Sequence, residues 1–168
     1  MLSYSLTPQG FGEKGDIFLI GKMGKYISIL YRQEQRHMNQ IVQQYGLGPS
    51  CYNFLLALSD HEGASQKQLC SIMMVDEAIA TRTMKKLEQE GFVTRQKDGR
   101  DLRCYTLALT ERGRALIPQL QHSLNDWWTT LTSDFSQQEA SALLDACIGM
   151  SQKAIEKNQE PAERERRS

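Results

Sequence analysis

The side chains of this chain with the clearest chemical capacity are a hydroxyl group and a series of cations that follow one another over a short segment. Thr81, Arg82 and Lys85 lie close together, and from Arg82 to Arg103 the chain has seven basic residues against four acidic ones, a net charge of +3. Guanidinium and ammonium groups neutralise phosphates, and a hydroxyl group forms hydrogen bonds with phosphates or base edges. The segment therefore predicts a local surface that binds nucleic acid.

The charge of the whole chain limits this prediction. Its 168 residues contain 20 basic and 20 acidic side chains, so the net charge is zero. A protein that coats nucleic acid regardless of sequence carries a general excess of basic residues. Because the basic residues are instead segregated, we expect a specific site on an otherwise ordinary folded protein.

The pattern around these residues predicts a helix followed by a hairpin. Asp76 is an N-cap candidate for a helix that ends at Gly91. Alternation of apolar and polar residues over 92–95 and 104–109 then predicts two strands around the polar turn 97–100. The inner face of the helix is predicted as Ala80, Met84 and Leu87, and the outer face as Ala78, Thr81, Arg82 and Lys85.

Two shorter helices are predicted before this one. Gly48-Pro49 favours a helix start and Gly63 an end, and a capping box at Ser65 opens the next helix. Two short helices joined by a tight turn and followed by a basic hairpin make a winged helix-turn-helix, here residues 48–109. A major groove admits one helix, and the hairpin can place an arginine at the minor groove.

The flanking segments predict a helical dimerisation region over 17–46 and 110–157. Residues 17–46 have apolar residues at helical spacing over roughly 28 residues, about 42 Å, which a small domain cannot cover without a partner helix. Thr110 and a capping box at Ser136 open two further helices, the first with Pro118 inside it. Residues 1–16 are predicted as an arm and 158–168 as a disordered tail. The expected fold is one mainly α domain (α+β) that forms a homodimer.

From Ile17 to Ile155 the sequence resembles the multiple-antibiotic-resistance regulator (MarR) family of bacterial transcription factors. The resemblance is carried by DEAIATRTMKKLEQEGFVTRQKDGRDLRCYTLALTERGRAL, in which several family motifs occur in order at suitable spacing. These motifs fall on Asp76, Thr81-Arg82, Leu87-Glu88, Gly91-Phe92-Val93, Asp101-Leu102-Arg103 and Leu109-Thr110-Glu111-Arg112-Gly113.

The resemblance implies that the first helix and the last two form the dimer interface, and that Thr81, Arg82 and Lys85 face the major groove. It implies that Arg103 is the wing arginine and that Asp101 is its ion-pair partner. Arg95 and Arg100 are expected to contact phosphates. Double-stranded DNA with a pseudo-palindromic operator is the expected partner, with two recognition helices about 34 Å apart.

We therefore expect a transcriptional regulator, a repressor whose DNA affinity a small aromatic ligand modulates. Pockets of this family lie between the dimer helices and the DNA-binding lobe. Aromatic residues either wall such a cavity or pack in the core, and both interpretations stay open. These residues are Tyr26, Tyr31, Tyr52, Phe54, Trp127 and Trp128.

Two alternative functions follow from other features. Cys51 lies near a predicted helix N-terminus, where the dipole lowers the pKa of a thiol, so an oxidant-sensing regulator is one alternative to a structural cysteine. The other is a winged-helix module that binds a protein without reading DNA. In that case Arg82 and Lys85 belong to a solvated helix face, and Arg103 pairs only with an aspartate.

An enzyme is not expected. The sequence has no Gly-rich phosphate loop, no nucleophile elbow and no clustered Cys, His and carboxylate residues. His37, His61 and His122 have no metal-ligand spacing, so no metal and no cofactor are predicted. The chain has no run of about 18 apolar residues and no signal-peptide pattern, so a cytoplasmic protein without a membrane partner is expected.

Overall fold

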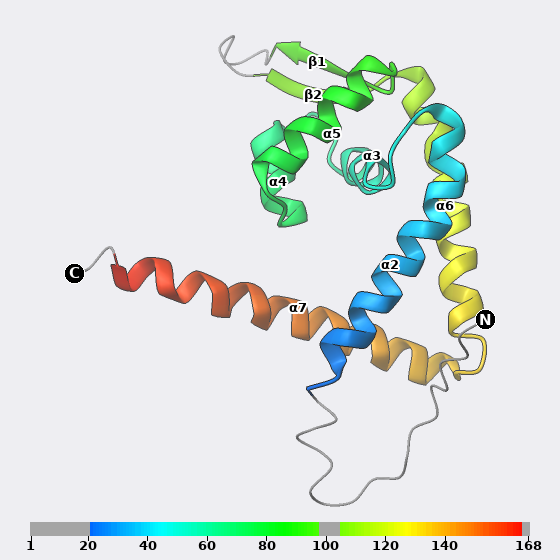
Figure 1. Ribbon diagram of the computed structural model, residues 1–168, viewed down its shortest axis with the longest axis vertical. Helices are drawn as coiled ribbons and strands as arrows, with labels where there is room; N and C mark the ends of the chain where they lie inside the picture. The colour runs from blue at the N-terminus through cyan, green and yellow to red at the C-terminus, as the bar shows by residue number, and fades with distance from the viewer. Residues whose placement is uncertain (1–20, 98–104, 166–168) are drawn as a thin grey trace, which may run out of the picture. The chain divides into compact units, whose positions relative to one another are not determined.

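The computed structural model describes residues 21–97 and 105–165 of the chain, with side chains up to Asn158. The protein is mainly helical with one small sheet, as predicted, and it divides into two compact units, up to Leu124 and from Asn125. The elements are α2 (Met23–Val42), η1 (Gln43–Tyr45), α3 (Cys51–Asp60), α4 (Gln66–Met73), α5 (Glu77–Gln89), β1 (Val93–Lys97), β2 (Tyr105–Leu109), α6 (Glu111–Leu131) and α7 (Gln137–Glu165) (Figure 1).

The helix α2, which leads to Gly46, has fewer residues than the sequence predicts. α2 begins at Met23 rather than Ile17 and has 20 residues, about 30 Å at 1.5 Å per residue. It continues as the single 3₁₀ turn η1 and ends at Gly46, whose φ of 72° is left-handed. The predicted arm, 1–16, and the first predicted helical residues, 17–20, lie outside the described residues. α3 likewise begins at Cys51 instead of Pro49, because residues 49–50 form a turn.

The predicted caps are confirmed. Asp76 accepts a hydrogen bond of 2.7 Å from the main-chain N–H of Ala78, which fixes the start of α5. Ser65 and Gln68 form both bonds of a capping box at α4, 3.3 and 2.8 Å long. The box at the start of α7 is also present, since Ser136 N–H donates to Glu139 Oε2 over 2.8 Å. Each cap satisfies a main-chain donor that a helix leaves unpaired.

The hairpin is antiparallel and is joined to the helices on both sides. β1 and β2 pair from Val93 opposite Leu109 to Lys97 opposite Tyr105. The main chain of Leu107 also bonds to Gly63 and Ala64, over 3.0 and 2.9 Å, so the loop before α4 continues the sheet edge. The predicted turn of the wing lies outside the described residues.

One core holds the first unit together and orients α5. The inner face of α5 consists of Ala80, Met84 and Leu87, all fully buried as predicted, and Thr83 is buried beside them. The side chains around them come from the end of α2, α3, α4, both strands and the first turns of α6. Because three successive turns of α5 are anchored in this core, the rotation of the helix about its axis is fixed.

The start of α6 packs tightly on the corner between α5 and β1. Thr110 Oγ1 donates to the carbonyl oxygen of Gly91 over 2.7 Å and accepts from the N–H of Gly113 over 3.1 Å, which makes it the predicted cap. The Arg112 guanidinium lies 4.4 Å over the Phe92 ring and donates to Glu90 O over 2.8 Å. Gly113 lies so close to the Phe92 carbonyl that an added Cβ would overlap its oxygen. This corner therefore depends on α6.

The C-terminal part differs from the prediction. α7 runs to Glu165, whereas a disordered tail is predicted from residue 158. The tail is polar and cannot build a core, but Glu, Arg, Gln and Ala are good helix formers, so a polar sequence is compatible with a helix. α6 continues through Pro118. No helix in the described ranges is both long and apolar enough to cross a bilayer.

Candidate nucleic-acid interface

The outer face of α5 carries the predicted contact residues. Ala78, Thr81, Arg82 and Lys85 are all exposed, which confirms their predicted orientation. The Arg82 side chain lies along its own helix, with Nε donating to the carbonyl oxygen of Ala78 over 3.3 Å. Among the described residues Lys85 has no ion-pair partner. This face therefore presents a small side chain, a hydroxyl group and two cations to solvent.

The neighbouring cation is compensated within the helix. Lys86 Nζ lies 2.8 Å from Oε1 of Glu90, the residue at the C-terminal cap of α5. The hydrogen bond and the charge of Lys86 lower the pKa of the Glu90 carboxyl group. The free positive charge of α5 is therefore that of Arg82 and Lys85.

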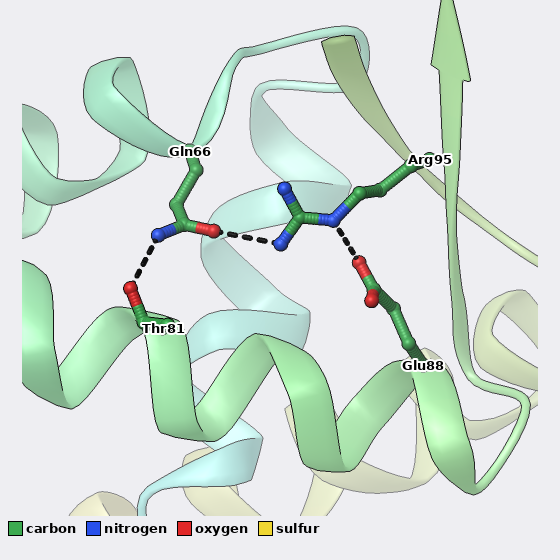
Figure 2. A network of polar contacts seen from close by, with 4 residues as sticks. All are labelled: Gln66, Thr81, Glu88 and Arg95. Carbon is green, nitrogen blue, oxygen red and sulfur yellow. Dashed lines mark hydrogen bonds and ion pairs between the residues drawn. The ribbon is translucent and has the colours of Figure 1, made fainter.

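Arg95 on β1 joins the wing to the two helices. Its Nε forms an ion pair with Glu88 of α5, and its terminal nitrogen donates to Gln66 Oε1 of α4 over 2.8 Å. Gln66 Nε2 in turn donates to Thr81 Oγ1 over 2.8 Å, so four side chains from three elements form one network (Figure 2). The predicted phosphate contact Arg95 is thus held within the protein, although 38% of its side chain stays exposed.

Sequence reasoning missed Gln66 and Glu88 as part of this surface. Gln66 directly follows Ser65 in the predicted capping box, and Glu88 belongs to the Leu87-Glu88 family motif, so neither residue was predicted to lie at the interface. No local pattern links positions 15 and 29 residues apart, which are the separations of Gln66 from Thr81 and from Arg95. The tip of the wing, with Arg100, Asp101 and Arg103, lies outside the described residues, and the Asp101–Arg103 pair stays a prediction.

The aromatic residues predicted as cavity walls have different environments. Tyr52 and Phe54 are 0% and 2% exposed and belong to the core. The Tyr52 hydroxyl donates to Glu34 over 2.6 Å and accepts from Gln35 over 3.2 Å, which ties α3 to α2. Burial and the Glu34 carboxylate together raise the pKa of Tyr52. These two rings act as packing residues.

The other aromatic residues do not line the hollows seen beside α4. Tyr26 and Tyr31 are exposed on α2, and Trp127 belongs to the second unit. The hollows beside α4 are lined by residues such as Gly63, Gln68 and Ser71. The described residues contain no group of three or more His, Cys, Asp and Glu side chains that could hold a metal ion.

Of the two interpretations of Cys51, the structure favours the structural cysteine. The side chain lies at the start of α3 but is only 2% exposed. Burial raises the pKa of the thiol and outweighs the bond to Gly48 and the charge of Lys86, both of which lower it. Desolvation destabilises the thiolate here more than its position at a helix start stabilises it, so Cys51 is a packing residue.

Comparison with known proteins gives a consistent result. The family model described as "MarR family" matches residues 49–105, which run from the turn before α3 to the start of β2. The HTH-type transcriptional regulator SarZ of Staphylococcus epidermidis is 30% identical over 106 residues, 62% of this chain and 69% of its own length.

Solved structures extend the likeness to most of the chain. The crystal structure of a MarR transcriptional regulator from Methanosarcina mazei is 30% identical with a TM-score of 0.74, covering 80% of this chain and 96% of that one. A MarR-family regulator from Listeria monocytogenes, solved with a 26mer DNA, shares the fold at 21% identity. Its TM-score is 0.74, over 78% of this chain and 87% of that one.

Proposed function

The chain belongs to the MarR family, and from this premise we propose that it is a homodimeric transcriptional regulator that binds duplex DNA at a pseudo-palindromic site. The observation that carries the proposal is the outer face of α5, where Thr81, Arg82 and Lys85 are exposed next to a two-stranded wing. An α-helix with its side chains is about 10–12 Å across, and the major groove is about 12 Å wide. α5 fits this groove.

Each residue of this face has a role that its chemistry supports. Ala78 has no bulk that would hold the helix away from the bases, and Thr81 forms a hydrogen bond with the DNA. Arg82 and Lys85 neutralise phosphates, which supplies affinity without sequence information. At the wing we propose backbone contacts by Arg95, Arg100 and Arg103, with Asp101 orienting the last of these.

The proposed homodimer is supported by apolar side chains that each unit exposes. On α2 these are Met23, Tyr26, Ile27, Leu30 and Tyr31, which are 40–57% exposed. In the second unit they are Trp128, Leu131, Phe135, Leu143, Leu144, Ile148 and Met150. Single exposed apolar residues are normal, but series of this size along helices are typical of surfaces that another chain covers.

We further propose that the protein acts in the cytoplasm as a repressor, and that a small ligand modulates it. Two recognition helices must enter major grooves about 34 Å apart. A ligand that favours another spacing shifts the dimer away from the DNA-competent state by no more than its differential affinity. Tyr26 and Tyr31 lie on the proposed dimer surface of α2, so a ligand that contacts these rings would act directly on the packing of the two chains.

In vitro selection from a random duplex library tests DNA binding directly. The purified chain should enrich a pseudo-palindromic sequence, and a mobility shift with that sequence should give a specific band at about 0.1 M salt. Arg82→Ala should weaken binding by about 10-fold or more, because each protomer of the dimer loses a charged contact. Lys153→Ala, which removes an exposed lysine of α7, is the matched control and should bind as the wild type does. No enriched sequence, or equal binding by both variants, would overturn the proposal.

A further inference from the structure

We propose that Gln66 sets the hydrogen-bonding direction of Thr81, so that α5 presents this hydroxyl group to DNA as a donor. The group that Thr81 then selects is an acceptor oxygen or nitrogen of the DNA. This inference rests on the proposed function, because it assigns a positioning residue to the same DNA-binding face. It depends on the network of Glu88, Arg95, Gln66 and Thr81 (Figure 2).

The direction of each hydrogen bond in this network is fixed by chemistry. The Arg95 guanidinium is a donor only, so the oxygen of the Gln66 amide must face it, over 2.8 Å. The NH₂ group of the same amide then faces Thr81, also over 2.8 Å. Because an amide NH₂ is a donor only, the hydroxyl oxygen of Thr81 must accept. The Gln66 amide therefore has one orientation.

Glu88 anchors the other end of the network. Its carboxylate pairs with Nε of Arg95, so the guanidinium is held between Glu88 and Gln66 and keeps its place beside the amide. Glu88 and Thr81 both belong to α5, whereas Gln66 belongs to α4 and Arg95 to β1. The network is thus supported from three elements of the same core, and Thr81 accepts its hydrogen bond from α4 and not from its own helix.

The consequence is a hydroxyl proton that is available at the surface. A threonine hydroxyl has one proton and two acceptor lone pairs. In the described part of the chain, the bond from Gln66 is the only hydrogen bond of the Thr81 side chain. Thr130 and Thr132 of α6 and its C-terminal turn behave differently, since each donates its proton to the main-chain carbonyl four residues earlier.

A hydroxyl group in this state makes a better donor than acceptor. An accepted hydrogen bond polarises the O–H bond and strengthens the next bond in the chain. A DNA amino group would occupy the remaining lone pair of the Thr81 hydroxyl oxygen. The hydroxyl proton would then have no acceptor at a desolvated surface, which costs free energy. A phosphate oxygen, or N7, O6 or O4 of a base edge, uses the proton directly.

The substitution Gln66→Glu reverses the network with little change of shape. A carboxylate at this position accepts from Arg95 and also from Thr81, whose proton then points into the protein. The added negative charge has its own effect on DNA binding, so the matched control is Gln89→Glu, an exposed position of α5 outside the network. Both are compared with the wild type by fluorescence anisotropy on the duplex that the wild-type chain selects.

We expect Gln66→Glu to weaken DNA binding about 5- to 10-fold more than Gln89→Glu does. This is the effect of losing the hydrogen bond from Thr81 to the DNA when the Thr81 proton turns toward residue 66. In a Thr81→Val background this difference should disappear, because no hydroxyl remains to be turned. A loss confined to the selected duplex assigns the acceptor to a base, and an equal loss on unselected duplex of the same length assigns it to a phosphate.

Two results would overturn the inference while leaving the proposed function intact. One is equal weakening by Gln66→Glu and Gln89→Glu, and the other is a difference that persists without the Thr81 hydroxyl. If the wild-type chain selects no duplex at all, the proposed function itself fails, and the role of Gln66 fails with it.

Discussion

The replacement of Gly113 by alanine tests how the start of α6 supports the DNA-binding unit. A Cβ at this position would lie 3.2 Å from Leu109 Cδ2 and 3.2 Å from the carbonyl carbon of Phe92, with the Phe92 oxygen closer still. The obstructing group is main chain at the corner between α5 and β1, so no side-chain rotation relieves the overlap. Either the first turn of α6 or the corner must move.

The expected magnitude follows from two opposing effects. In an unhindered helix, glycine to alanine stabilises by about 0.5–1 kcal/mol. Overpacking a dense site costs about 1–3 kcal/mol, and a main-chain obstacle favours the upper end. We therefore expect Gly113→Ala to lower the free energy of unfolding by about 2 kcal/mol. For a chain of this size, that lowers Tm by about 4–8 °C.

Thermal unfolding followed by circular dichroism measures the effect, at one protomer concentration because dimer stability depends on it. Gly149→Ala is the matched control, since α7 also contains this glycine and no described heavy atom lies within 4 Å of its added Cβ. It should raise Tm slightly. A rise in Tm for both variants would refute the close packing of α6 on the corner.

Three further outcomes are expected. In the native protein, mass spectrometry after alkylation should find the exposed Cys147 modified before Cys51, which reacts only on unfolding because its thiol is buried and burial raises its pKa. The hydrogen bonds of Ser136 lower the pKa of Glu139. The stability that this carboxylate contributes is therefore fully present above about pH 4.3 and is lost as the pH falls further. Glu139→Gln should accordingly reduce the acid sensitivity of unfolding. Leu30→Glu on the exposed face of α2 should weaken the dimer at least 10-fold in analytical ultracentrifugation, whereas a stable monomer in the wild type would contradict the interface.

The features that the sequence predicts correctly are local. Asp76 and Ser65 cap their helices because the donor and acceptor lie two or three residues apart. The inner face of α5 follows from helical periodicity, and this periodicity also places Thr81 and Arg82 outside. Such contacts depend on spacing that can be counted along the chain.

The features that the sequence does not predict depend on the tertiary fold. The position of Cys51 at a helix start suggested a low pKa, but only the packed core shows that its thiol is desolvated. Arg95 was predicted to contact a phosphate, and only the tertiary structure shows that Glu88 and Gln66 hold its guanidinium. The tail from residue 158 was predicted to be disordered because it lacks apolar residues, but this lack excludes a core and does not exclude a helix, and α7 extends to Glu165.

The salt dependence of DNA affinity tests the central claim most directly, since it counts the phosphates that the outer face of α5 neutralises. The equilibrium constant for the selected duplex is measured between about 50 and 200 mM salt for the wild type, Lys85→Ala and the control Lys153→Ala. Each lost phosphate contact reduces the slope of log K against log salt concentration by about 0.9, so a dimer of Lys85→Ala should lose nearly two. The slope of Lys153→Ala should equal that of the wild type. A Lys85→Ala protein with the wild-type slope would contradict the assignment of this face to DNA.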